Sequence, residues 1–257
     1  MMTEPSQKEQ KLMQVWLDIA EALLNAGAEI SRVEDTLHYL AAYHDVKEID
    51  AFTITAGILV SCTFSDGNTI TQTRRVMKSP SMDIHRIEKL NSLSRDASAE
   101  KLSAKELEER FRKIIGEEMP WTTMLGSVMA AASFCIFFGG SLMDAVVSGL
   151  FGIVICLFSK KIGRYITNNV FYNFLASLMA GTLIYLTGRL LPTLHVDKVI
   201  IGDIMLLVPG LTITIAMRDM LSGDTISGLL RFVESLLWTG GLAAGFLVSM
   251  FLAGGAL

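Results

Sequence analysis

The sequence is poor in cysteine and in clustered metal ligands. Its three cysteines, Cys62, Cys135 and Cys156, form no CxxC pair, and its four histidines lie far apart along the chain. An odd, scattered set of cysteines is typical of neither a disulfide framework nor a zinc site. We therefore expect no metal site, no cofactor and no oxidising compartment.

An excess of basic charge and the common nucleotide motifs are also absent. The net charge is −4, and no basic patch alternates with aromatic residues, which argues against a nucleic-acid partner. No Walker loop, GxSxG elbow or HExxH motif occurs, so nothing supports ATP hydrolysis by this chain. The first residues, MMTEPSQKEQK, lack the apolar core of a secretory signal, which predicts that the N-terminal part stays in the cytoplasm.

What the sequence does contain is a sharp division of charge. Residues 1–118 hold most of the charged side chains, whereas residues 119–257 are dominated by apolar runs of about 18 or more residues. This division predicts a cytoplasmic α+β domain over 1–118 and a transmembrane domain over 119–257. The expected fold class is a membrane all-α bundle of five transmembrane helices preceded by that α+β domain.

Helical periodicity opens the N-terminal domain. Apolar residues at a spacing of three and four predict an amphipathic helix over residues 8–25, and Gly27 is a natural stop after it. Ser31 and Glu34 have the spacing of a capping box, which predicts the start of a second helix.

The pattern then changes to a period of two. Residues 53–64 alternate so that the even-numbered side chains face one way, which predicts a half-buried strand, and residues 69–76 are expected to return as its hairpin partner. Asp83 is expected to cap a third helix. Ser103 and Glu106 form a second capping box, which predicts a fourth.

The C-terminal half reads as five membrane spans. Each is long enough to cross about 30 Å of hydrocarbon, and they cover residues 122–140, 142–159, 169–190, 197–217 and 232–254. Lys and Arg concentrate in the turns after the second and fourth spans, so the positive-inside rule places the N-terminal domain in the cytoplasm. The expected location is the plasma (inner) membrane. Stripes of small residues on most spans, such as Ser148 and Gly152, are expected to serve helix packing.

The fourth span carries two interruptions, Asp203 and the pair Pro209–Gly210. Pro209 cannot donate a backbone hydrogen bond, so the carbonyl of Met205 loses its helical partner. In hydrocarbon such a break is tolerated only against protein or a wet cavity. Two simpler interpretations stay open: Asp203 lies at the outer interface near Lys198, and Pro209 is only a structural kink.

Polar and charged residues follow the break. They are Thr212, Thr214, Arg218, Asp219, Asp224, Arg231 and Glu234. Ionisable residues around a broken helix are typical of a pathway for a polar solute, although ordinary charges at the membrane surface are the alternative. Arg231 and Glu234 are three positions apart and can pair on one helix face.

Three segments carry a family resemblance: GAEISRVEDTL (27–37), TITAGILVSCTFSDG (53–67) and LLVPGLTITIAMRDMLSGDTISGLLR (206–231). In this order they resemble the threonine/serine exporter (ThrE) family. The matching motif positions are Gly27, Glu29, Arg32, Glu34, Gly57, Pro209, Gly210, Asp219, Gly223, Asp224, Gly228 and Arg231.

The resemblance implies a fold and a partner. In that family a cytoplasmic domain precedes a membrane domain, and some members are split into two proteins. With five spans, this chain resembles the larger component of the split form. The resemblance thus implies a small hydrophobic membrane protein as partner, a homo- or hetero-oligomer, and export of threonine and serine or of succinate.

We therefore expect a component of a secondary-active exporter of small carboxylate-bearing metabolites, and not an enzyme. Asp203 or Asp219 would titrate, and Arg218 or Arg231 would bind the substrate carboxylate. A membrane-anchored enzyme that uses Glu29, Arg32 and Glu34 is one alternative, and a channel or regulatory subunit is another.

Overall fold

The computed structural model describes residues 7–44, 46–77, 82–117 and 121–253. Contacts divide them into two compact units. The N-terminal unit combines the described residues up to Glu117 with Leu211–Phe232, and the bundle unit combines residues 121–210 with the described residues from Val233 onward. The predicted domain boundary at 118/119 lies outside the described residues and stays a prediction.

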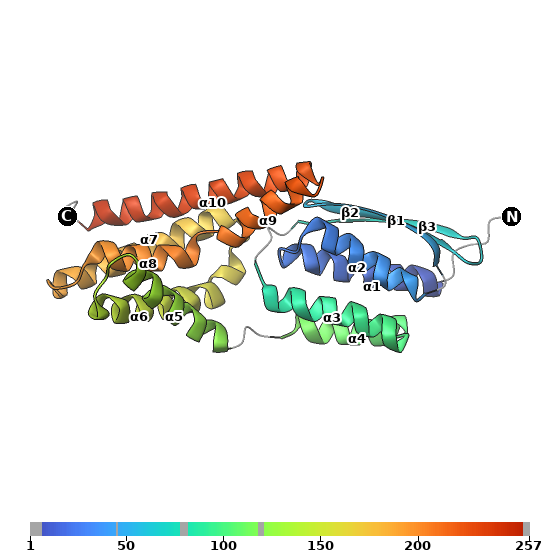
Figure 1. Cartoon of the computed structure of the whole chain (residues 1–257), viewed down its shortest axis with the longest axis horizontal. Coiled ribbons are helices and arrows are strands. Elements are labelled where there is room, and N and C mark those ends of the chain that lie inside the picture. The colour runs from blue at the N-terminus through green and yellow to red at the C-terminus, as the bar shows by residue number, and fades with distance from the viewer. Residues whose placement is uncertain (1–6, 45, 78–81, 118–120, 254–257) are drawn as a thin grey trace. The chain divides into compact units, whose positions relative to one another are not determined.

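The N-terminal unit is a layered α+β structure. Its elements up to Glu117 are α1 (Gln7–Asn25), α2 (Ile30–Ala42), β1 (Val46–Ile54), β2 (Gly57–Phe64), β3 (Thr69–Arg75), α3 (Ile84–Glu100) and α4 (Ala104–Ile115). The strands form an antiparallel sheet in the order β1-β2-β3. In Figure 1 the sheet covers one side of α1 and α2, while α3 and α4 cover the other side. One core of buried aliphatic and aromatic side chains joins these layers.

The predicted strand over 53–64 is only partly right. β2 has the expected alternation, with Ile58, Val60, Cys62 and Phe64 buried, and β3 pairs with it as the expected hairpin. However, Ala56 is exposed in a two-residue turn, and the chain runs back into β1, which the sequence did not predict. The alternation of apolar and polar residues continues through this turn, so periodicity alone did not show the reversal.

The expected caps have mixed outcomes. Asp83 accepts from the Arg86 N–H at 2.9 Å and caps α3, and Ser103 with Glu106 forms the capping box of α4. The capping box predicted for Ser31 and Glu34 is wrong. α2 begins at Ile30, so Ser31 already lies inside the helix and cannot act as its N-cap.

The second segment of the N-terminal unit consists of α9 (Gly210–Leu221), from Leu211 on, and the first turns of α10 (Thr225–Leu252). Gly223, with φ +105°, lies in the short turn between them, a conformation that favours glycine. A Cβ atom at Gly228 would lie 2.6 Å from the carbonyl oxygen of Ala216. The absence of a side chain at Gly228 therefore lets α10 pack directly on the backbone of α9.

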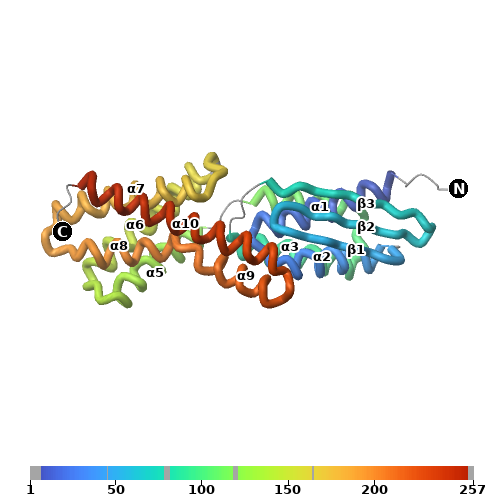
Figure 2. Tube along the Cα trace, turned by 90° about the horizontal axis from the view of Figure 1, so that it is seen from above, coloured from blue at the N-terminus to red at the C-terminus, as the bar shows by residue number. Residues whose placement is uncertain are grey.

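The bundle unit is entirely helical among the described residues. It contains α5 (Trp121–Phe137), α6 (Leu142–Lys161), the short 3-10 helix η1 (Gly163–Tyr165), α7 (Asn169–Leu190), α8 (Val196–Leu207) and the rest of α10. α10 runs beside α7 (Figures 1 and 2), where a Cβ atom at Gly241 would lie 2.6 Å from the Val170 carbonyl oxygen.

Most predicted small-residue stripes do serve close packing. A Cβ atom at Gly152 of α6 would lie 2.9 Å from the Ser127 carbonyl oxygen of α5, and Gly181 of α7 meets Ser249 of α10. Gly126 of α5 is different, because an added Cβ there would meet no described atom within 4 Å.

The span predictions match the helices in outline. By length and composition, α6, α7 and α10 are long and apolar enough to cross a membrane. There are up to four such spans if the bent pair of α8 and α9 is counted as a single span. The first predicted span, 122–140, is shorter than expected, because α5 ends at Phe137 after 17 residues. α10 begins at Thr225, earlier than the predicted 232, and residue 254 lies outside the described residues.

Candidate functional site

The fourth predicted span is broken where the sequence indicated. α8 ends at Leu207, and Val208 is extended with φ −66° and ψ 127° before α9 begins at Gly210. The two helices are bent by 44° at this break. Gly210 is exposed, and a Cβ atom added there would meet no described atom within 4 Å. The backbone is therefore irregular and sterically open beside Pro209, as expected for a Pro-Gly pair.

Asp203 lies on α8, four residues before the helix ends, and its side chain is completely buried. Its Oδ1 accepts from the Ser148 hydroxyl of α6 at 3.1 Å, whereas its Oδ2 has no hydrogen-bond partner among the described residues. The simpler interpretation, that Asp203 extends to the surface beside Lys198, is wrong. Lys198 instead lies 3.1 Å from the carboxylate of its neighbour Asp197.

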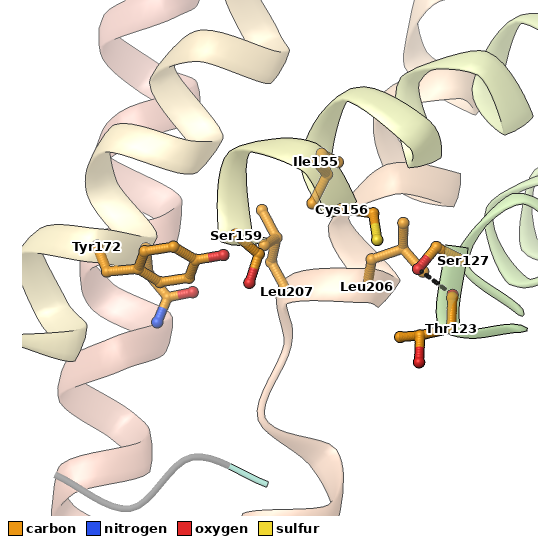
Figure 3. Close-up of a pocket in the computed structure, with 9 residues that line it drawn as sticks. Thr123, Ser127, Ile155, Cys156, Ser159, Tyr172, Leu206 and Leu207 are labelled. Atoms are coloured by element: carbon orange, nitrogen blue, oxygen red, sulfur yellow. Dashed lines mark hydrogen bonds between the residues drawn. The ribbon is translucent and has the colours of Figure 1, made fainter. Parts of the chain in front are cut away.

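A cavity of about 190 Å³ with a mixed polar and apolar lining lies at the same end of α8. It is lined by residues of α5, α6, α7 and α8: Thr123, Ser127, Ile155, Cys156, Ser159, Tyr172, Asn173, Leu206 and Leu207. Figure 3 shows the Tyr172 hydroxyl directed toward Ser159, and the Ser127 hydroxyl bonded to the Thr123 carbonyl at 3.0 Å. The cavity thus offers hydroxyl and amide groups but no charged side chain.

A second buried carboxylate of the bundle unit was not singled out by the sequence analysis. Asp144 lies in the first turn of α6, where it completes a capping box with Ser141. It also accepts from the backbone N–H of His195 at 2.9 Å and lies 2.9 Å from the Nδ1 atom of that ring. The S-x-x-D spacing could have indicated the cap, but His195 is 51 positions away. The carboxylate fixes the end of the loop that precedes α8.

The charges after the break form a buried pair within the N-terminal unit. Arg231 Nη1 lies 3.2 Å from Asp219 Oδ2, and both residues are only 2% exposed. Asp219 Oδ1 accepts from the Ile30 N–H at 3.3 Å, and Arg231 Nη2 donates to the Ala28 carbonyl at 2.6 Å. Because the α2 N-cap residue, Glu29, makes no side-chain cap, Asp219 supplies the missing acceptor from α9.

A second ion pair lies beside the buried one. Arg218 Nη1 is 2.8 Å from Glu29 Oε1, with the guanidinium side chain 64% exposed and the carboxylate side chain 14% exposed. The segment from Gly27 to Ile30 is therefore held by Arg218, Asp219 and Arg231 together. Gly27 itself adopts φ +84°, where a side chain would be strained.

A cavity of about 400 Å³ opens next to this ion pair. Every residue that lines it carries a polar or charged group: Glu29, Ser31, Arg32, Asp35, Thr36, Tyr39, Asn91, Ser94, Arg95 and Arg218. Arg95 was not predicted as a site residue, because it stands on the exposed face of α3 without a motif around it. The sequence did single out Glu29, Arg32 and Arg218.

Glu34 faces the sheet and not its own helix start. Its Oε1 accepts from the backbone N–H of Thr53 at 2.8 Å. Burial raises the pKa of this carboxyl, and the nearby carboxylate of Asp224 raises it further, although the Thr53 hydrogen bond opposes them. Glu34 therefore connects α2 to β1 by a hydrogen bond, although its carboxylate is partly desolvated.

The other predicted residues of this region have diverse environments. Thr212 is buried on α9 and Thr214 is exposed, while Asp224 and Glu234 are half-buried. By compact unit, Asp219, Asp224 and Arg231 belong with Glu29 and Arg32, whereas Asp203 belongs to the bundle unit. The predicted residues are thus divided between the two compact units.

Comparison with known proteins identifies relatives over most of the chain. The family model described as "Putative threonine/serine exporter" (ThrE) matches residues 14–253. "Probable succinate transporter subunit YjjP" of Klebsiella aerogenes is 25% identical over 235 residues, which are 90% of this chain and 90% of that protein.

Two longer relatives match as well. "Probable threonine/serine exporter" of Mycobacterium tuberculosis is 22% identical over 93% of this chain but only 46% of its own length. "Threonine/serine exporter" of Corynebacterium glutamicum is 24% identical over 61% of this chain and 32% of its own length. The chain therefore spans less than half of each of these two proteins. No solved structure matches it.

Proposed function

Because the chain belongs to the threonine/serine exporter (ThrE) family, we propose that it is one component of a secondary-active exporter of small carboxylate-bearing metabolites. The names of the relatives support either threonine and serine or a dicarboxylate such as succinate as substrate. The membrane would be the plasma (inner) membrane, with the N-terminal unit on the cytoplasmic side.

The observation that carries the mechanism is the buried carboxyl of Asp203 on a helix that breaks six residues later, at Pro209. In hydrocarbon a carboxyl with one unpartnered oxygen is stable as the neutral acid, or as the anion when it meets water, an ion or a substrate. Asp203 can therefore exchange a proton as the substrate passes. The open backbone at Gly210 supplies the irregular, polar main chain that such pathways use.

The other charged residues divide into two roles in this proposal. Asp219 and Arg231 form an ion pair and bond the backbone of residues 28 and 30, so in this proposal they position the Gly27–Ile30 segment and do not bind substrate. Of the two predicted arginines, Arg218 is the more exposed and borders a cavity, but Glu29 pairs with it, so it would meet a substrate carboxylate only by exchanging that partner.

A second protein would complete the exporter. One relative is named as a subunit, and the chain covers only 46% of the longer mycobacterial relative. We propose that a small hydrophobic membrane protein supplies the remaining spans. This chain would contribute five spans, with α5 as the short first one.

The test is metabolite export from cells that lack both components. Restoring this chain together with its partner should produce export of succinate or threonine that saturates and follows the imposed gradient, whereas either component alone should not. No export from the restored pair would refute the proposal, and flux without saturation would indicate a channel.

A further inference from the structure

Two guanidinium groups of the N-terminal unit border the same cavity. Arg32 on α2 and Arg95 on α3 both line the 400 Å³ cavity, and neither side chain makes an ion pair or hydrogen bond with any residue that the structure describes. The third arginine of the cavity, Arg218, is already engaged by Glu29. Guanidinium groups are suited to charge-assisted, bidentate hydrogen bonds with carboxylates, so Arg32 and Arg95 in a single cavity favour an anionic ligand.

The charges of the cavity favour one class of anion. Once Glu29 and Arg218 neutralise each other, Arg32 and Arg95 oppose the single carboxylate of Asp35. A ligand with two carboxylates can pair one with each guanidinium, whereas a zwitterionic amino acid has only one to offer. The volume is within the range of small-molecule pockets, and Ser31, Tyr39 and Asn91 add neutral hydrogen-bonding groups.

We propose that this cavity is a binding site for a small dicarboxylate, held between Arg32 and Arg95. The site rests on the proposed function, since it would collect the substrate on the cytoplasmic side before export. Such a site would give a role to Glu29 and Arg32, two of the positions that match the family motif. Glu29 also pairs with Arg218 on α9, so a ligand in the cavity would lie next to the segment that follows the break.

The test is equilibrium dialysis of the purified full-length chain in lipid nanodiscs, with radiolabelled succinate, threonine and inorganic phosphate as separate probes. Succinate should bind saturably, and threonine and phosphate at least about tenfold more weakly. Arg32→Gln and Arg95→Gln should each weaken succinate binding by about tenfold or more, because each removes a charge-assisted hydrogen bond. Arg75→Gln is the matched control, since Arg75 is exposed on β3 and does not line the cavity.

Asp35→Asn separates the two substrate classes. It removes a negative charge from the cavity, so it should strengthen succinate binding, whereas a site for a zwitterion would lose the partner of the ammonium group and bind threonine less well. Thermal unfolding of the Gln variants should equal that of the wild type, because neither arginine has a described partner to lose.

Several outcomes would overturn the inference: no saturable succinate binding, tighter binding of threonine or phosphate, or succinate binding that survives both Gln variants. Failure of the proposed function is distinguishable, because binding is measured without transport. If export proceeds and dialysis shows no binding, only the dicarboxylate site is wrong. If both are observed, Arg32→Gln should raise the KM for export with little change in the maximal rate.

Discussion

The buried pair of Asp219 and Arg231 supports a quantitative prediction. Replacing Asp219 with Ala leaves the guanidinium of Arg231 buried without its counter-ion, and it also removes the acceptor of the Ile30 N–H. Breaking one side of a buried ion pair costs about 3–5 kcal/mol. We expect a loss of this size in the free energy of unfolding of the N-terminal unit, measured by urea titration of the full chain in nanodiscs.

Hydrogen exchange locates the effect. The Ile30 amide should exchange faster in Asp219→Ala than in the wild type, since its only described acceptor is gone. The double variant Asp219→Ala/Arg231→Met should cost less than the sum of the two single variants, because it leaves no unpaired charge. Asp50→Asn, on the exposed surface of β1, is the control and should change stability by less than about 0.5 kcal/mol.

The reasoning would be refuted by an unchanged exchange rate at Ile30, or by strictly additive costs of the two single variants. Either result would show that the pair does not hold the start of α2.

Three further predictions concern other elements. Glu34 has a raised pKa, so its contribution to stability is fully present below the ordinary value of 4.5 and is lost as pH rises through the folded-state pKa. The free energy of unfolding of the wild type should therefore fall toward neutral pH, and this fall should be smaller in Glu34→Gln. In a denaturation assay, Gly228→Ala should lower the free energy of unfolding by about 1–3 kcal/mol, because the added Cβ would collide with α9. Gly240→Ala is the control and should not be destabilising, since an added Cβ there meets no described atom within 4 Å. Asp144→Ala should accelerate exchange of the His195 amide, because it removes the acceptor of that N–H, and an unchanged rate would show that Asp144 does not fix the loop before α8.

The parts of the fold that depend on neighbouring residues were predictable. α1, the β2–β3 hairpin and the caps at Asp83 and Ser103 follow from periodicity and side-chain spacing within a few positions. The break at Pro209 was equally predictable, since proline removes its donor whatever the surroundings.

Contacts across long sequence separations were not predictable from spacing. The Ile30 N–H and Asp219 are 189 positions apart, whereas the pair expected for Arg231 and Glu234 joins residues three positions apart on one helix. The family motif did place Asp219 and Arg231 in one set with Glu29, although it could not show that they meet. Likewise, the sequence analysis expected Ser148 to serve helix packing and did not predict that its hydroxyl donates to Asp203.

The most direct test of the central claim, that solutes cross beside the broken span, is the export rate of two variants, Asp203→Asn and Pro209→Ala, in membranes that contain the partner protein. Each variant should be inserted at the wild-type level. Asp203→Asn should abolish gradient-driven export because it can no longer exchange a proton, and Pro209→Ala should slow export by restoring a continuous helix. Wild-type export rates in both variants would contradict the account.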